Sequence, residues 1–109
     1  MANPWIDKYI FPGGMLPSLK QLGEATENIL ILEDLHNFGL YYAKTLLARE
    51  QNFRNNYPNL PKKKYDEKFY RMWRYYMLSC VGSFNARHMH LWQIVFSKGK
   101  LDEMYISVR

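Results

Sequence analysis

The chain has 109 residues and a formal net charge of +5, and 48% of its residues are hydrophobic and 17% aromatic. This length allows one domain at most, and this composition excludes a disordered chain. Cys80 is the sole cysteine of the sequence, which excludes a disulfide framework and fits a reducing cytoplasm. No stretch approaches the roughly 20 apolar residues that span a bilayer, and no signal peptide is recognisable, so we expect a soluble protein.

The three histidines do not predict a metal site. His88 and His90 are two residues apart and would point to opposite faces of a strand, and His36 is far away in the sequence. We interpret all three as ordinary histidines and expect no metal. The net positive charge favours anionic partners, a class that includes both nucleic acids and the headgroups of a membrane surface.

The first thirty residues predict two short helices. Residues 4–10 predict a helical turn, which the proline and glycines of residues 11–14 end. Ser18 and Gln21 have the spacing of a capping box and predict the start of a second helix. Asn28, which tolerates positive φ, predicts where that helix stops.

A strand and an amphipathic helix follow. The apolar run over residues 29–38 predicts a strand that is buried on both faces. Tyr42, Leu46 and Phe53 recur at helical spacing and predict a helix over 42–56. The positions expected on the outer face of this helix are Lys44, Arg49 and Glu50.

The second half of the chain predicts a long helix and two further strands. The basic run at 62–64 is typical of a solvated linker, and Asp66 is the expected cap of the helix after it. Residues 89–96 predict a second buried strand, and the alternation over 104–108 predicts an edge strand. The helix positions that repeat every three or four residues are Phe69, Met72, Trp73, Tyr76, Cys80 and Phe84.

The expected fold class is α+β, with helices and an antiparallel strand pair. Two strands of the buried type are too few to form a stable sheet. We therefore expect the remaining strands to lie elsewhere, which makes this chain a fragment of a larger fold.

Three runs carry a family resemblance. They are YIFPGGMLPS at 9–18, YAKTL at 42–46, and a third run that extends from FYRMWRYY at 69–76 through LWQIVFSK at 91–98. In order and spacing they resemble the C-terminal part of cyclopropane-fatty-acyl-phospholipid synthases and the related mycolic acid cyclopropane synthases. The first run is the most specific, because a phenylalanine, a proline and two glycines precede a capped helix.

The resemblance implies a part of an S-adenosylmethionine-dependent methyltransferase with a Rossmann-like sheet. It implies that residues 1–109 form the C-terminal, lipid-side portion of that domain and that the two strands are its final antiparallel pair. No glycine-rich turn follows a strand in this sequence, so we expect the part that binds S-adenosylmethionine to be absent. We therefore expect the isolated chain to bind no cofactor and to be inactive.

The resemblance also implies a catalytic tyrosine. Enzymes of this family add a methylene across a cis double bond of an acyl chain, and a bound bicarbonate is thought to accept the proton that is lost. Tyr42 occupies the position of the family's tyrosine that hydrogen-bonds this bicarbonate. A phenol suits this task because it donates to an anion without ionising near neutral pH. Helical spacing by itself would make Tyr42 a core aromatic residue.

The acyl channel is the second site that the resemblance implies. An aromatic, dry wall would stabilise a nearby cation by roughly 0.5 to 2 kcal/mol and exclude water. For Leu46, Cys80 and Phe84, helical spacing predicts a core position equally well. The residues carried over to the channel are Phe11, Leu46, Tyr76, Cys80 and Phe84.

The resemblance implies that the partner is a membrane phospholipid with an unsaturated acyl chain. It also implies that the enzyme is cytoplasmic and peripherally associated with the membrane. Lys62, Lys63 and Lys64 are the candidates for headgroup contact. Exposed apolar surface is compatible with a homodimer. Two alternatives remain open. The first is a nucleic-acid-binding module, although the sequence contains no recognised nucleic-acid-binding motif. The second is a non-catalytic interaction protein that pairs through its strand edges.

Overall fold

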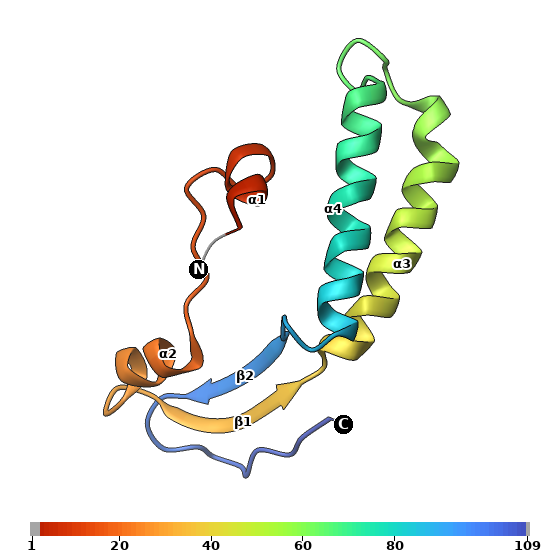
Figure 1. Cartoon of the computed structure of the whole chain (residues 1–109). Helices are drawn as coiled ribbons and strands as arrows, with labels where there is room; N and C mark the ends of the chain where they lie inside the picture. Colours follow the sequence, from red (N-terminus) through yellow and green to blue (C-terminus); the bar gives the residue numbers. More distant parts are fainter. Residues whose placement is uncertain (1–2, 109) are drawn as a thin grey trace. The chain divides into compact units, whose positions relative to one another are not determined.

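The computed structural model describes residues 3–108, which divide into two units. Unit 1 contains the described residues up to His36 and from Trp92 onward, and unit 2 is Asn37–Leu91. The elements in chain order are α1 (Pro4–Tyr9), α2 (Leu19–Thr26), β1 (Ile31–Asn37), α3 (Gly39–Asn56), the short 3-10 helix η1 (Tyr57–Asn59), α4 (Glu67–Asn85) and β2 (Trp92–Ser97) (Figure 1). No helix within residues 3–108 is both long and apolar enough to cross a membrane.

The helical turn predicted near the start of the chain is confirmed as α1. The Asn3 side chain accepts hydrogen bonds from the backbone amides of Trp5 and Ile6, which begins the helix. The loop that follows is closed by Asp7, whose carboxylate accepts from the amide of Gly13 at 2.9 Å. Gly13 has a φ of +71°, a conformation that favours glycine.

The capping box predicted for the second helix is also confirmed. The Ser18 hydroxyl accepts from the Gln21 amide at 3.1 Å, and the Gln21 side chain accepts from the Ser18 amide at 2.8 Å. Asn28 has a φ of +63°, as expected for the residue that stops this helix. These features depend only on neighbours in the sequence.

The sheet consists of β1 and β2, which run antiparallel (Figure 1). Both strands were predicted, but the prediction that β1 is buried on both faces is wrong for this chain. Ile31 is 53% exposed and Leu32 is 55% exposed. A strand is buried on both faces only where other layers cover it, and these two strands form the whole sheet of the described residues.

The predicted edge strand over 104–108 is wrong as well. Residues 103–108 are irregular, and their apolar side chains are exposed, including Met104 at 83% and Val108 at 89%. This segment contacts β1 through side chains: the hydroxyls of Tyr105 and Ser107 each donate to the carboxylate of Asp34 at 3.4 Å. Alternation alone forms no strand without a partner that offers backbone hydrogen bonds.

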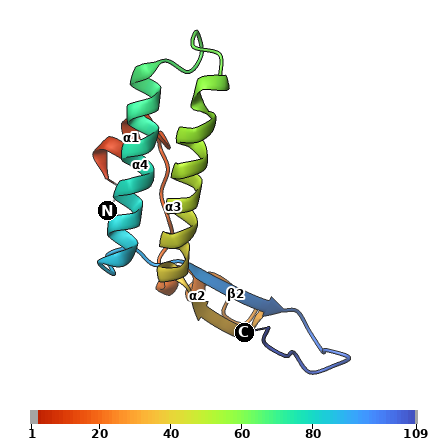
Figure 2. The same cartoon turned by 90° about the vertical axis from the view of Figure 1, so that its right-hand side faces the viewer.

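Unit 2 is a helical hairpin in which α3 and α4 lie side by side (Figures 1 and 2). Both helices were predicted, and α3 begins at Gly39, three residues earlier than expected. The buried core of the hairpin is Ala43, Leu46, Cys80, Val81 and Phe84, and the side chains packed against it are Tyr42, Tyr76, Met89 and Leu91. The helical spacing thus identified Leu46, Cys80 and Phe84 as core positions, but it left out Ala43 and Val81.

The basic run at 62–64 is exposed, as predicted for a solvated linker, and the segment between the two helices also makes contacts of its own. Lys62 Nζ lies 3.6 Å from the centre of the Tyr57 ring and donates to the Tyr57 carbonyl oxygen at 2.6 Å. The Tyr57 hydroxyl in turn donates to the Tyr65 carbonyl oxygen at 2.8 Å. Asp66 caps α4 as predicted, accepting from the Phe69 amide at 2.9 Å.

Candidate functional site

Tyr42 lies in the second turn of α3, with its ring in the core of unit 2 and its hydroxyl at the edge. The ring meets Phe84 edge to face, with 5.3 Å between centroids and 80° between planes. The hydroxyl oxygen accepts a hydrogen bond from Arg49 Nη1 at 3.1 Å. The Tyr42 ring is therefore packed against the core, and its hydroxyl lies at the edge of the core.

Four of the five predicted acyl-channel residues lie around Tyr42 in unit 2. Leu46, Cys80 and Phe84 are each at most 5% exposed and form one cluster, and Tyr76 packs against it. In this chain these side chains fill the interior of the hairpin. The fifth candidate, Phe11, belongs to unit 1 and is 56% exposed.

Cys80 and Tyr76 remain neutral near neutral pH. Burial raises the pKa of the Cys80 thiol, and a hydrogen bond with Tyr76 opposes this only in part. Burial also raises the pKa of the Tyr76 phenol, with further contributions from Cys80 and Tyr42. Neither the Tyr76 phenol nor the Cys80 thiol therefore carries a negative charge. The buried thiol is also a poor nucleophile.

The junction between β1 and α3 is filled by protein atoms. Gly39 stands there, and a Cβ on it would lie 3.1 Å from Phe84 Cδ1 and 3.4 Å from the Leu91 amide nitrogen. The Asn37 side chain accepts from the Gly39 amide at 3.1 Å. A strand-to-helix turn that binds a cofactor leaves its amides and the space beside them open, so this junction does not fit S-adenosylmethionine.

Comparison with known proteins identifies the family. Residues 1–94 match the family described as mycolic acid cyclopropane synthetase. The chain belongs to this family. The resemblance expected from the three sequence runs is thus confirmed for the mycolic acid cyclopropane synthetase family.

Relatives within the cyclopropane synthetase family show how much of the fold this chain represents. It is 46% identical over 98 residues to the cyclopropane-fatty-acyl-phospholipid synthase of Escherichia coli K12, over 90% of this chain and 25% of that protein. It is 42% identical over 81 residues to a sequence of the same name from Citrobacter freundii, over 74% of this chain and 90% of that sequence. It is 33% identical over 94 residues to the tuberculostearic acid methyltransferase UfaA1 of Mycobacterium tuberculosis, over 84% of this chain and 22% of that protein. The chain therefore spans about a quarter of the length of the Escherichia coli relative.

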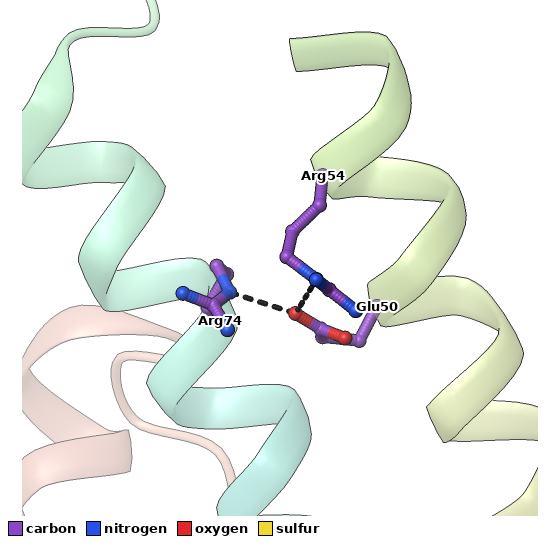
Figure 3. Close-up of polar contacts among 3 residues, drawn as sticks. All are labelled: Glu50, Arg54 and Arg74. Atoms are coloured by element: carbon purple, nitrogen blue, oxygen red, sulfur yellow. Dashed lines mark hydrogen bonds and ion pairs between the residues drawn. The ribbon is translucent and has the colours of Figure 1, made fainter.

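In this member of the cyclopropane synthetase family, a buried carboxylate was missed by the sequence reasoning. Glu50 was expected on the outer face of α3, but it is only 3% exposed. One of its carboxylate oxygens accepts from Arg74 Nε and from Arg54 Nε, both at 2.7 Å (Figure 3). The spacing of Glu50 and Arg54 along α3 was the available signal.

The two arginines keep Glu50 ionised. Burial by itself would raise the pKa of this carboxyl, but the hydrogen bonds from Arg74 and Arg54 outweigh burial and lower the pKa. Arg74 lies on α4, so the contact joins the two helices of the cyclopropane synthetase hairpin. The contact thus links α3 to α4 through a buried, ionised carboxylate.

Proposed function

We propose that this chain is the C-terminal, lipid-side part of an S-adenosylmethionine-dependent methyltransferase that makes cyclopropane fatty acids. The complete enzyme would add a methylene across the cis double bond of an unsaturated phospholipid acyl chain. The observation that carries the proposal is the family match over residues 1–94, together with 46% identity to a protein named cyclopropane-fatty-acyl-phospholipid synthase. Below, the complete enzyme means this chain joined to the rest of the family fold.

In the complete enzyme, β1 and β2 would be the final antiparallel pair of a Rossmann-like sheet. The exposure of Ile31 and Leu32 supports this, because apolar side chains on a strand become buried once further layers cover both faces. A groove of about 500 Å³ in unit 1 supports it too, since apolar side chains of α2, β1 and β2 line it, including Leu22, Leu35 and Phe96. The region formed by residues 1–109 would thus be one part of a single larger domain.

Tyr42 would hydrogen-bond a bicarbonate ion. Bicarbonate, when bound, supplies the base that accepts the proton lost as the cyclopropane ring closes. The residues fit this ion because the Tyr42 oxygen already accepts from Arg49, which leaves its hydrogen for an anion. Tyr76 and Cys80 are neutral, so neither of these two side chains repels the ion.

The acyl chain would lie against the apolar side chains next to Tyr42. Tyr76 and Phe84 offer aromatic faces, which stabilise a developing cation and exclude water from it. Leu46 and Cys80 complete the apolar surface, and Phe11 stays a candidate for the acyl channel of the complete enzyme. Their task is to hold the double bond in a dry, uncharged environment.

S-adenosylmethionine would bind outside residues 3–108. Phe84 fills the space beside Gly39, at the turn where a strand meets a helix in this chain. We therefore expect the isolated chain to be inactive and the complete enzyme to be active. The methyl donor would be held by a glycine-rich turn in the rest of the family fold.

The complete enzyme would work in the cytoplasm at the membrane surface, in peripheral contact with anionic headgroups. The net charge of +5 and the exposed lysines Lys63 and Lys64 support headgroup contact. The buried, reduced Cys80 is compatible with a cytoplasmic location. A homodimer is the oligomer that we propose, and nucleic acid is not among the proposed partners.

A chimera tests the proposal. This chain would replace the matching C-terminal region of the Escherichia coli synthase in a strain that lacks its own enzyme. We expect cyclopropane fatty acids in lipid extracts by gas chromatography, and none when the chain is expressed alone. A chimera that folds and binds S-adenosylmethionine but makes no cyclopropane product would refute the proposal and favour a non-catalytic interaction protein.

A further inference from the structure

Arg49 is the one charged side chain hydrogen-bonded to Tyr42 within residues 37–91. We infer that Arg49 is a positioning residue, which fixes the Tyr42 hydroxyl with its proton directed toward a bound bicarbonate. This inference rests on the proposed function of Tyr42. It adds a residue that the sequence placed merely on the outer face of the helix.

The geometry between the two residues is specific. They are seven residues apart on α3, so they lie on the same side of the helix two turns apart. Arg49 Nη1 donates to the Tyr42 oxygen at 3.1 Å, and Arg49 Cζ lies 5.6 Å from the centre of the ring. The guanidinium therefore contacts both the oxygen and the face of the same phenol.

The contact with Arg49 leaves the Tyr42 hydroxyl free to donate its own hydrogen. Arginine has five N–H donors and no acceptor, so the hydrogen of the Tyr42 hydroxyl is not used in the contact. Within residues 37–91 that hydroxyl donates to no other group. A phenol that accepts from a cation is polarised and becomes a stronger donor through its own hydrogen.

The positive charge of Arg49 is not neutralised by the carboxylate next to it. Glu50 turns inward, where Arg54 and Arg74 engage it, and Arg49 forms no ion pair within residues 37–91. An uncompensated cation and an O–H donor thus stand side by side at the edge of the core. The O–H of Tyr42, polarised by this cation, suits a small oxyanion such as bicarbonate.

The test compares four variants in the complete enzyme: Tyr42→Phe, Arg49→Met, Arg49→Lys, and Tyr42→Phe with Arg49→Met. Bicarbonate binding is measured by NMR line broadening of ¹³C-labelled bicarbonate, and S-adenosylmethionine binding by calorimetry. We expect Arg49→Met to raise the Kd for bicarbonate about 10-fold, because a charge-assisted contact is lost. Arg49→Lys should restore most of that affinity, and the Kd for S-adenosylmethionine should stay unchanged throughout.

The double variant separates positioning from other roles. If Arg49 acts through the Tyr42 hydroxyl, Arg49→Met adds less than about a 2-fold loss once Tyr42 is Phe. A full additional loss in that background would overturn the inference, as would an unchanged Kd in Arg49→Met alone. In either of these two outcomes, a raised Kd for bicarbonate in Tyr42→Phe would still support the proposed function. An unchanged Kd for bicarbonate in Tyr42→Phe would overturn the role of Tyr42 itself.

A matched control removes an arginine elsewhere. Arg71 lies exposed on α4, and Arg71→Met lowers the net charge by the same amount. We expect Arg71→Met to leave bicarbonate binding unchanged. A loss equal to that of Arg49→Met would show a general effect of charge and would overturn the inference.

Discussion

The Glu50 carboxylate on α3 accepts a hydrogen bond from Arg74 on α4 at 2.7 Å, at a position where Glu50 is only 3% exposed. A carboxylate buried to this extent is stable only when it is paired and hydrogen-bonded. Because the pair joins the two helices of unit 2, it also supports the hairpin that carries Tyr42.

Arg74→Met should destabilise the hairpin. The variant leaves a buried carboxylate with Arg54 as its remaining partner, and we expect a loss of about 2 kcal/mol in the free energy of unfolding. Urea unfolding of the chain, followed by helical circular dichroism, measures this loss. Arg71→Met on the same helix should change stability by less than about 0.5 kcal/mol, and equal losses in both variants would contradict the account.

The contribution of Glu50 should depend on pH. Its pKa is lowered in the folded chain from an ordinary value of 4.5, so its stabilising effect is complete above that value and is lost as the pH falls below it. The difference in unfolding free energy between the parent chain and Glu50→Gln should therefore shrink on going from pH 7 to pH 3. A difference that stays constant or grows on acidification would show that Glu50 is not held ionised.

Gly39→Ala should destabilise unit 2. The added Cβ would lie 3.1 Å from a Phe84 ring that is itself only 4% exposed and has little room to move. We expect a loss of about 1 kcal/mol from this overpacking, measured as a lower urea midpoint.

Gly82 provides the matched control for Gly39. It lies within α4, and a Cβ added to it would meet no neighbouring side chain within 4 Å. Gly82→Ala should therefore raise stability by up to about 1 kcal/mol through helix propensity. Destabilisation by Gly82→Ala, or a gain from Gly39→Ala, would contradict the packing described here.

Replacing Lys63 and Lys64 by Ser should weaken binding of the complete enzyme to anionic vesicles. Each lysine near such a surface contributes on the order of 1 kcal/mol, so the double variant should bind at least about 10-fold more weakly. Lys62 is left in place because its contacts with Tyr57 make it part of the loop structure. Flotation with vesicles rich in anionic lipid provides the measurement.

The control for this variant is the pair Lys98 and Lys100, which is exposed in unit 1. Their replacement by Ser removes the same charge from another part of the chain. Equal weakening in both double variants would point to net charge alone, and no weakening in Lys63→Ser with Lys64→Ser would end the proposal of headgroup contact there.

Features set by neighbouring residues could be predicted from the sequence. The reciprocal hydrogen bonds of Ser18 and Gln21 and the left-handed Asn28 depend on a few adjacent positions. The helical repeat likewise placed Leu46, Cys80 and Phe84 in the core. Local hydrogen bonding and hydrophobic periodicity are sufficient for predictions of this kind.

Features that depend on distant partners could not be predicted in this way. An apolar run such as the one around Ile31 indicates a strand, but its burial depends on layers that the run itself does not specify. Glu50 was placed outside because charged residues usually are, and its burial depends on Arg74, 24 residues away. The position of Arg49 over Tyr42 depends on side-chain conformation, which no spacing rule determines.

The central claim is that Tyr42 serves the reaction of a cyclopropane synthase, and Tyr42→Phe in the complete enzyme tests it most directly. Tyr41→Phe is the control, because Tyr41 is adjacent and 68% exposed. We predict that Tyr42→Phe lowers turnover by at least about 10-fold while the Kd for S-adenosylmethionine stays the same, and that Tyr41→Phe changes neither. Equal loss of turnover and of S-adenosylmethionine binding in Tyr42→Phe would make Tyr42 a structural residue and contradict the account.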